Sequence, residues 1–297
     1  MDMRNKASLK FIKFRDFNQL KPSGTIAIHG KVAKAIVKSA LVNKYGFKFV
    51  TDFFSIHPSN HFYSKPDFKK DLILELDKTA EMYDFMLDWD QDISESKSEK
   101  IKKNIKQLHL LLRQIIISDK NAYIRYRSFF LEAITLHFIQ KKHVMPKRNI
   151  FHEPIICVGK KPFLKSITRG SGRYRVGDIK VDFAFKKAEE SGGLFLYECK
   201  ASIHAFVKSI DLINVGDLTS INRKNRGVSA RHKINYMLAI KDFFKQNFVD
   251  DGLNLSCEAF FTTFGGDMPD YNVNPKFGVG SQIKVIKASE FTSYLYP

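Results

Sequence analysis

The chain has 297 residues, 44% of them hydrophobic, and a formal net charge of +18 at pH 7. It is long enough to bury a sizeable core in one large domain or two. No segment reaches about eighteen apolar residues without a charge, so the sequence predicts no membrane span, and residues 1–6 lack the apolar stretch of a signal peptide. The positive charge is spread through segments that also carry folding patterns, which favours a polyanion such as nucleic acid as the partner.

The cysteine pattern indicates a reducing compartment. Cys157, Cys199 and Cys257 are far apart in the sequence, odd in number and set in strand-like runs. They fit buried free thiols rather than a disulfide framework or a zinc site. We therefore expect a cytoplasmic protein.

The N-terminal part of the chain begins with a basic helix. Residues 30–45 form a predicted helix that stops at Gly46. Its lysines follow roughly helical spacing, at Lys31, Lys34, Lys38 and Lys44. They form either a face that contacts phosphates or a solvated face, and the sequence does not decide between the two. Residues 47–54 are predicted to form a strand.

Three longer helices are predicted next. Residues 66–89, 101–115 and 121–142 place apolar residues at helical spacing. The polar stretch 91–99 is the most linker-like segment of the chain. Glu132 is the only carboxylate of the third helix and lies on the flank of its apolar face.

The C-terminal half alternates predicted strands and helices. Residues 150–158 and 254–264 are predicted strands, and residues 282–287 form the last one. A helix-like stretch covers residues 202–213, and Ser229 is placed to cap the helix that follows it.

Two stretches of this half are strongly basic. The first covers residues 160–175, and the second is a predicted loop at residues 222–227. Such side chains suit contacts with a phosphate backbone, and a solvated loop is the alternative for the second stretch. The candidate nucleic-acid ligands are Arg169, Arg173, Arg175, Arg223, Lys224 and Arg226.

Residues 178–200 carry the most informative pattern, a predicted hairpin. In its second run the last residues, Glu198 and Lys200, share one face. In its first run Asp182 lies on the face opposite an apolar series that alternates with period two, formed by Ile179, Val181, Phe183 and Phe185. Between the two runs is a polar turn that ends in Ser-Gly-Gly.

Pairing of these two strands would bring Asp182 beside Glu198 at one edge of the sheet. Two neighbouring carboxylates repel each other and raise a pKa unless a cation lies between them. A hard divalent cation suits oxygen ligands, and Mg²⁺ typically takes one or two carboxylates plus phosphate oxygens. A lysine beside the metal, here Lys200, can steady a phosphate or help to deprotonate a water.

This arrangement resembles the PD-(D/E)xK nuclease superfamily, which has the restriction-endonuclease-like fold. Asp182 is followed, after fifteen residues, by Glu198-Cys199-Lys200. Val181 stands where the family pattern has a proline. The resemblance covers about residues 120–265 and implies a core of helix, three strands, helix and strand.

The resemblance also implies roles for individual residues. Asp182 and Glu198 would bind Mg²⁺, with Mn²⁺ as a substitute, and Lys200 would assist the attacking water. In the superfamily the helix before the first core strand often brings an acidic residue to the metal, which makes Glu132 a further candidate. The alternative for Glu132 is a surface glutamate paired with Arg125, with Arg127 or with solvent.

The bare acidic-x-lysine pattern is weak evidence on its own. It occurs four times, at residues 67–69, 95–97, 178–180 and 198–200. Only the last occurrence ends an apolar strand that follows an acid-bearing strand. The alternative is a surface hairpin whose charges are solvated.

We therefore predict an α/β (α+β) protein with a restriction-endonuclease-like core, a mixed sheet flanked by helices. Residues 1–118 form a mainly helical region for substrate or partner binding, and residues 119–297 form the nuclease domain. The predicted activity is Mg²⁺-dependent hydrolysis of phosphodiester bonds in double-stranded DNA, by an endonuclease of the restriction or phage-defence kind. A homodimer or a partner protein is compatible with the sequence.

Two alternatives stay open. One is a nucleic-acid-binding or regulatory protein without catalysis, in which the hairpin is structural. The other is an RNA nuclease, because the absence of an aromatic RNA-recognition signature does not exclude RNA. The excess of positive charge supports both the nuclease and the protein without catalysis.

Overall fold

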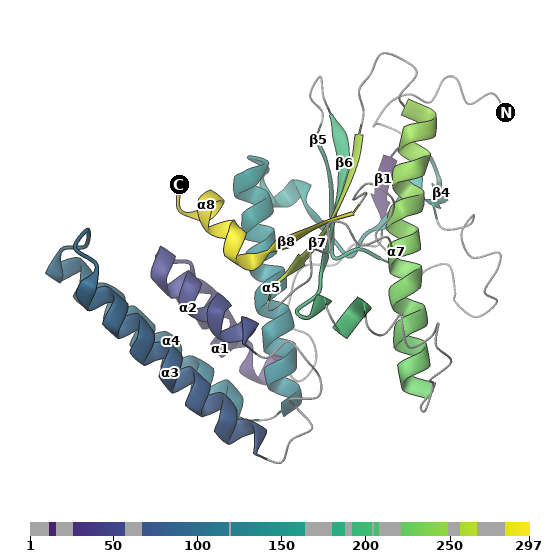
Figure 1. The fold of residues 1–297 in the computed structure, drawn as a ribbon. Helices are drawn as coiled ribbons and strands as arrows, with labels where there is room; N and C mark the ends of the chain where they lie inside the picture. Colours follow the sequence, from purple (N-terminus) through teal and green to yellow (C-terminus); the bar gives the residue numbers. More distant parts are fainter. Residues whose placement is uncertain are drawn as a thin grey trace.

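The computed structural model describes residues 12–15, 26–56, 67–118, 120–163, 180–187, 192–203, 205–207, 221–248, 256–265 and 283–297. Figure 1 shows a sheet that lies between helix α5 (Lys120–Lys142) and helix α7 (Ile221–Phe248), with further helices beside α5. The predicted mixed α/β class is confirmed. None of the described helices is long and apolar enough to cross a membrane.

The main sheet has five strands in the order β2-β5-β6-β7-β8. Their bounds are β2 Phe151–His152, β5 Phe183–Lys187, β6 Gly193–Cys199, β7 Ser256–Thr263 and β8 Ile283–Lys287. The first two neighbouring pairs are antiparallel, and β6, β7 and β8 run parallel. Among the strands of the main sheet, the order α5, β2, β5, β6, α7, β7 is the order of helix, three strands, helix and strand that the resemblance implies. Strands β3 and β4, which lie between β2 and β5 in the chain, belong to a second sheet.

Alternate residues of β6 enter two different hydrophobic clusters. Phe195 and Tyr197 belong to the α5-side cluster, which also contains the buried residues of the N-terminal helices. Leu194 and Leu196 belong to the α7-side cluster. Because β6 follows period two, Glu198 lies on the α7 side of the sheet.

The predicted face of the first hairpin strand is only partly correct. Phe183 and Phe185 enter the α5-side cluster together, as the alternation predicts. Val181, expected beside them, packs in the α7-side cluster instead. The reason is that β5 begins only at Phe183, so the period-two rule does not extend back to Val181.

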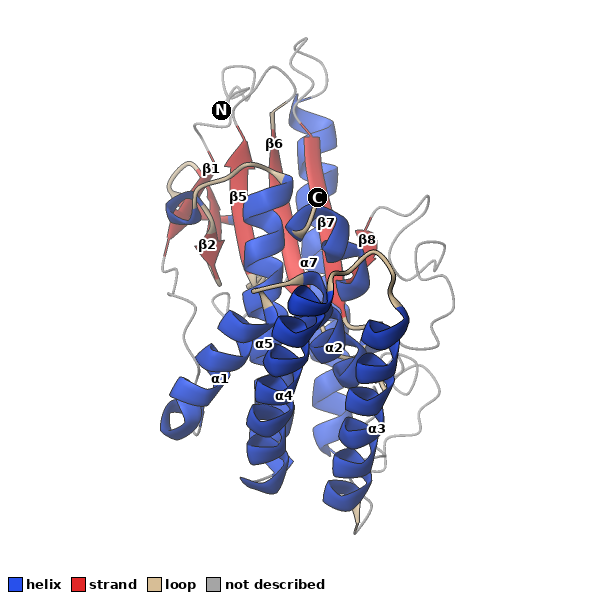
Figure 2. Ribbon diagram, turned by 90° about the vertical axis from the view of Figure 1, so that its left-hand side faces the viewer, coloured by secondary structure: helices blue, strands red, loops and turns tan. Residues whose placement is uncertain are grey.

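The N-terminal helices are α1 (Ile26–Ala40), α2 (Lys44–Ser55), α3 (Phe68–Trp89) and α4 (Glu95–Ser118). Figure 2 shows them below the sheet, on the side of α5. The predicted stripe of α4, formed by Ile101, Ile105, Leu108, Leu112 and Ile115, is buried as expected. The α5-side cluster runs from these helices into the sheet, and so crosses the predicted boundary between residues 118 and 119.

The predicted strand at residues 47–54 is wrong, because these residues form most of α2. Asn43 caps this helix, with its side chain accepting a hydrogen bond of 2.8 Å from the backbone N–H of Gly46. A side chain at Gly46 would lie 2.4 Å from Oδ1 of Asn104, so the glycine permits close packing of α2 on α4 rather than ending a helix. Burial of Phe47, Val50 and other apolar residues outweighs their preference for strands.

The predicted strand at residues 150–158 is broken into two. Glu153 has a positive φ of 48° and is followed by Pro154. Together these two residues turn the chain away from the main sheet. Strand β3 (Ile155–Val158) therefore joins a second sheet with β1 (Ile12–Arg15) and β4 (Lys161–Pro162), in the order β1-β3-β4. Only β2 remains in the main sheet, and a short 3-10 helix, η4 (Lys147–Asn149), precedes it.

Two predicted irregular segments are helical. Residues 222–227 were expected to form a loop before a helix capped by Ser229, but α7 already begins at Ile221. Arginine and lysine are good helix formers, and one internal glycine costs only about 1 kcal/mol. The second half of the predicted linker, from Glu95, is likewise the start of α4.

The chain ends on the α5 side of the sheet. After β8 come a 3-10 helix, η9 (Ala288–Phe291), and the short helix α8 (Thr292–Leu295). The ring of Phe291 stacks on that of Phe138 of α5, with centroids 4.1 Å apart.

Arg127 of α5 connects the helical region with the end of β6. Its side chain is 4% exposed, and it donates hydrogen bonds of 2.8 Å to the carbonyl oxygens of Phe54 and Ala201. The guanidinium group also lies 5.3 Å from the ring centre of Phe264. Since Ala201 directly follows Lys200, this side chain holds the chain in place just beyond the acidic-x-lysine motif.

We expect Arg127→Met to lower the free energy of unfolding by about 2–4 kcal/mol, because two carbonyl oxygens in the interior lose their donors. Urea unfolding followed by circular dichroism measures this. The matched control is Arg148→Met, at an exposed position of η4, which should change stability by less than about 0.5 kcal/mol. Equal effects of the two substitutions would contradict this role.

Candidate active site

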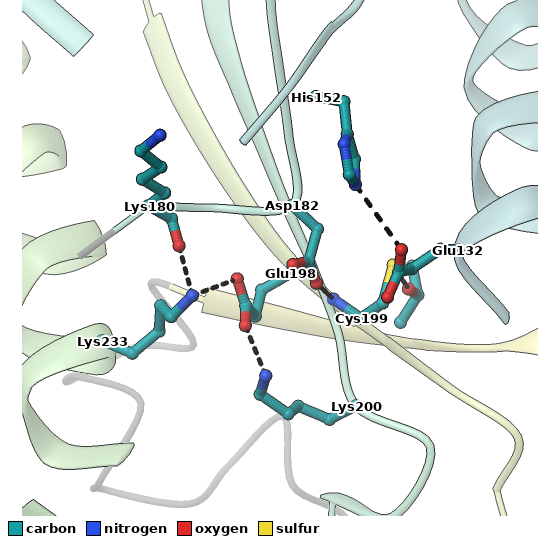
Figure 3. A network of polar contacts seen from close by, with 9 residues as sticks. Glu132, His152, Lys180, Asp182, Glu198, Cys199, Lys200 and Lys233 are labelled. Carbon is teal, nitrogen blue, oxygen red and sulfur yellow. Dashed lines mark hydrogen bonds and ion pairs between the residues drawn. The ribbon is translucent and has the colours of Figure 1, made fainter. Parts of the chain in front are cut away.

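Three of the predicted site residues lie together at adjacent strand ends. Asp182 directly precedes β5, Glu198 is the second-last residue of β6, and Lys200 directly follows that strand. The backbone N–H of Cys199 donates a hydrogen bond of 2.6 Å to Oδ2 of Asp182. This bond crosses from one strand to the other and holds the two acidic side chains next to each other (Figure 3).

Glu198 is fully buried and is neutralised by two lysines. Its Oε1 lies 2.5 Å from Nζ of Lys200, and its Oε2 accepts a hydrogen bond of 2.9 Å from Nζ of Lys233. Lys233 belongs to α7 and also donates to the carbonyl oxygen of Lys180. Lys233 was not predicted as a site residue, although it lies only four residues after Ser229, the predicted cap of this helix.

Burial and charge give the two carboxyl groups opposite shifts. Burial, followed by the negative charge of Glu198, raises the pKa of Asp182 from 3.8 to about 7. Burial would also raise the pKa of Glu198, but the ammonium groups of Lys200 and Lys233 outweigh it and hold this pKa below its ordinary value. Glu198 is therefore ionised at neutral pH, while Asp182 is only partly ionised.

Lys200 carries a positive charge in this site. Burial lowers its pKa, but the charges of Glu198 and Asp182 prevail and raise the pKa well above its ordinary value. Its side chain is 28% exposed, and its ammonium lies 5.5 Å from the ring centre of Phe206. Lys200 thus presents a cation rather than a base.

Glu132 reaches the same neighbourhood from the other face of the sheet. Its Oε2 lies 3.5 Å from Nε2 of His152, on β2, and its negative charge is one of the causes of the raised pKa of Asp182. Of the partners expected for Glu132, Arg127 is engaged with the two carbonyl oxygens described above. His152 was not predicted, since a single histidine, here between Phe151 and Glu153, gives no signal in the sequence.

Polar side chains of β7 and α5 also hold the end of β6 in place. The hydroxyl of Thr262, on β7, donates to Sγ of Cys199 at 3.2 Å and lies 3.0 Å from the hydroxyl of Thr135, on α5. The backbone N–H of Lys200 donates a hydrogen bond of 2.8 Å to the carbonyl oxygen of Thr262. The strand end that carries the motif is therefore tied to both its neighbouring strand and its covering helix.

The donor set fits a hard divalent cation. Asp182 and Glu198 supply carboxylate oxygens. The pKa of Asp182 is raised first by burial and then by the negative charge of Glu198, and a cation beside the two carboxylates would offset both effects. Within the part of the chain that the structure describes, no three His, Cys, Asp or Glu side chains are grouped to hold a metal ion. An ion held by two carboxylates would complete its shell with water and phosphate oxygens, as Mg²⁺ commonly does.

The predicted basic ligands are only partly placed. Arg169, Arg173 and Arg175 lie outside the described residues. The backbone of Arg223, Lys224 and Arg226 forms the first turns of α7, and their side chains are not described. In α1, the lysines at 31, 34 and 38 are exposed, while the opposite face is buried through Ala33, Ile36 and Ala40.

No family model, no curated protein and no solved structure matches this chain. The candidate function is therefore inferred from the chemistry of Asp182, Glu198, Lys200 and Lys233.

The raised pKa of Asp182 predicts a pH-dependent stability. The folded protein holds this proton more tightly than the unfolded chain, so the contribution is complete below about pH 4 and is lost as pH rises to about 7. Over this window the free energy of unfolding of the wild type should fall, by a few kcal/mol at most, relative to Asp182→Asn. Urea unfolding at a series of pH values measures the difference.

The control for this experiment is Asp84→Asn, at an exposed position of α3. Its stability curve should run parallel to that of the wild type from about pH 4 to about pH 7. If the curve of Asp182→Asn is also parallel, the pKa of Asp182 is not raised in the folded protein.

Proposed function

We propose that this protein is a divalent-metal-dependent nuclease of the PD-(D/E)xK type, which hydrolyses phosphodiester bonds in double-stranded DNA. The observation that carries the proposal is the meeting of Asp182, Glu198 and Lys200 at two adjacent strand ends, with a strongly raised pKa at Asp182. Perturbed carboxylates beside a lysine are typical of catalytic sites. The element order of the core supports the same proposal.

Each residue has a proposed role. Asp182 and Glu198 would hold Mg²⁺ or Mn²⁺, and such an ion would supply polarisation of the phosphate and a lowered pKa of a water. Lys200, as an ammonium, orients that water and offsets the negative charge that develops on the phosphate. Glu132, oriented by His152, contributes a further negative charge close to Asp182.

Lys233 acts as a positioning residue in this proposal. It holds Oε2 of Glu198 and the carbonyl oxygen of Lys180 at the same time. Glu198 is thereby kept in one rotamer, and the chain just before Asp182 is kept close to it. The two carboxylates are therefore already ordered in the folded protein, and their conformational entropy does not have to be lost during the reaction.

A nucleic acid is the favoured substrate because of the charge distribution, and DNA is proposed over RNA by analogy with endonucleases of this fold. The net charge of +18 suits a polyanion, and the exposed lysines of α1 lie on a helix that packs on α5, which carries Glu132. The three cysteines are buried and free, which supports a reducing cytoplasmic setting. A restriction or phage-defence role agrees with an endonuclease of this fold, by analogy.

One observation favours a second candidate. Glu198 is already neutralised by two lysines in this structure, so the network is also complete as a buried structural ion-pair cluster. In that case the protein binds nucleic acid, or regulates another protein, without cutting. Cleavage assays on duplex DNA and on RNA separate this candidate and the RNA nuclease from the DNA endonuclease.

We expect the wild type to cut plasmid DNA with Mg²⁺ and to stop when a chelator is added. Asp182→Asn and Lys200→Met should each lower the rate about a hundredfold or more, because each removes a charge from the reacting centre. Affinity for DNA should change only a few-fold, because the proposed phosphate contacts lie elsewhere. Gel assays of cleavage and fluorescence anisotropy measure the two quantities.

The matched control is Glu258→Gln, on the same sheet but in an exposed pair with Lys284. It should cut DNA at the wild-type rate. Binding of Mn²⁺ by titration calorimetry gives a second measurement that does not depend on activity, and Asp182→Asn should weaken it. A wild type that neither cuts nor binds the metal would support the non-catalytic candidate.

Binding to duplex DNA should weaken steeply with salt, because each phosphate contact releases counterions. Replacing the lysines at 31, 34 and 38 by glutamine should reduce the slope of log affinity against log salt by up to about 3, at about 0.9 for each contact. The control replaces the exposed lysines of α4 at 100, 103 and 106, beside the acidic helix α3. Equal slopes for the two triple variants would show that the α1 face does not contact DNA.

A further inference from the structure

A cavity on the α5 side of the sheet brings two lysines together with aromatic rings. Its volume is about 410 Å³, within the range of roughly 300–1,000 Å³ that is usual for small-molecule sites. Its walls come from α5, β7, β8 and the C-terminal helix α8, and Figure 1 shows α8 beside α5. We call it the α8 cavity. Five of its lining side chains are basic or aromatic: Phe138, Lys142, Phe260, Lys284 and Tyr294.

Lys142 places a half-buried ammonium group in the α8 cavity. Its Nζ lies 5.1 Å from the ring centre of Phe260, 5.2 Å from that of Phe138 and 5.6 Å from that of Tyr294. Among the described residues, this ammonium forms no hydrogen bond and no ion pair. An aromatic ring attracts a cation but does not neutralise its charge, so the cavity contains an ammonium group without a counter-ion.

The position of Lys142 does not follow from its place at the end of α5 alone. A cation in the last turn of a helix is stabilised by the helix dipole, but Lys141 lies in the same turn and is exposed. Burial lowers the pKa of Lys142, the negative charge of Glu258 acts against this shift, and the positive charge of Lys284 adds to it. An anion bound beside Lys142 would favour its charged form.

A second lysine reaches the same ring. Nζ of Lys284 lies 5.9 Å from the ring centre of Phe260 and 3.7 Å from Oε2 of Glu258, in an exposed pair. Because an exposed ion pair stabilises little, Lys284 is able to turn to a ligand. Two ammonium groups at one cavity match the charge of about −1.5 to −2 on a phosphate monoester at pH 7 better than the single charge of a carboxylate.

Tyr294 offers a surface for a planar ring. One face of Phe138 is covered by Phe291, and one face of Phe260 is covered by Tyr197, with ring centres 4.1 Å and 4.7 Å apart. Tyr294 instead meets Phe138 edge-on, at an interplanar angle of 86°, and is 44% exposed. Nucleobases stack on aromatic side chains of this kind because every base has a π-face.

We propose that the α8 cavity binds a nucleoside monophosphate. The phosphate lies between Lys142 and Lys284, each of which acts as a point charge, and the base stacks on Tyr294. The cavity is separate from the candidate active site, because Phe260 belongs to the α5-side cluster whereas Glu198 lies on the α7 side of the sheet. The site is therefore testable whether or not the protein cuts nucleic acid.

Titration calorimetry with a chelator present tests this site without any contribution from a divalent metal. We expect at least one of the adenosine, guanosine, cytidine and uridine monophosphates to bind the full-length protein with a Kd below about 1 mM. The corresponding nucleoside and inorganic phosphate should each bind at least about tenfold more weakly, since each lacks one of the two contacts. Absence of binding for all four nucleotides, or equal affinity for inorganic phosphate, would overturn the proposal.

Two substitutions locate the binding. Lys142→Met should weaken it by about tenfold or more through loss of the charge, and methionine keeps a favourable contact with the rings, so the fold is retained. Tyr294→Ala should weaken it by about fivefold or more through loss of stacking. The matched control is Lys141→Met, at the exposed neighbouring position, which should bind like the wild type. Equal losses in Lys141→Met and Lys142→Met would contradict the site.

Chemical labelling of the wild type gives a test that needs no variant. An amine-acetylating reagent is applied with and without the bound nucleotide, and mass spectrometry measures the modification of each lysine. The nucleotide should protect Lys142 several-fold and leave Lys141 unchanged. Equal labelling of Lys142 in both samples, or equal protection of the two lysines, would show that the nucleotide does not occupy the α8 cavity.

Discussion

The burial of one carboxylate constrains the whole centre of this molecule. A charge taken out of water must be paired, or it costs several kcal/mol, and Glu198 has no exposed surface. Its two partners come from different places: Lys200 from the end of its own strand and Lys233 from α7. Because Lys233 also holds the carbonyl oxygen of Lys180, one network fixes α7, the start of β5 and the end of β6 at a single point.

On the opposite face of the sheet, helix α5 contacts the same region around the end of β6. Thr135 reaches Cys199 by way of Thr262, and Glu132 pairs with His152 on the edge strand. Asp182 lies between these two systems, with a hydrogen bond to Cys199 and negative charge on both sides. Burial of Asp182 between the two systems raises its pKa most, and the negative charges of Glu198 and Glu132 raise it further, while Lys200 and Lys233 act against this shift.

Features that depend on local sequence pattern were predicted correctly. Features that depend on packing between distant segments were not. The hairpin follows from period two and a glycine turn, and the meeting of Asp182, Glu198 and Lys200 was predicted from that hairpin and from the family resemblance. Lys233 was missed because it lies 35 residues from Glu198, and nothing local tells which face of a helix meets a buried charge. Residues 47–54 favour strands by composition, yet contacts with the other helices make them helical.

In the proposed nuclease, the two lysines on Glu198 cannot have the same function. A divalent ion held by Asp182 and Glu198 would compete with both ammonium groups for the carboxylate oxygens of Glu198. One of the two ammonium groups would therefore have to move away. Lys233 is 18% exposed and carries a second hydrogen bond to the carbonyl oxygen of Lys180, so moving it would take the donor away from a partly buried carbonyl oxygen. Lys200 is 28% exposed, and among the described residues its ammonium forms an ion pair with Glu198 alone. Lys200 is therefore the cation that can turn from the carboxylate to a phosphate, while Lys233 keeps the carboxylate in position.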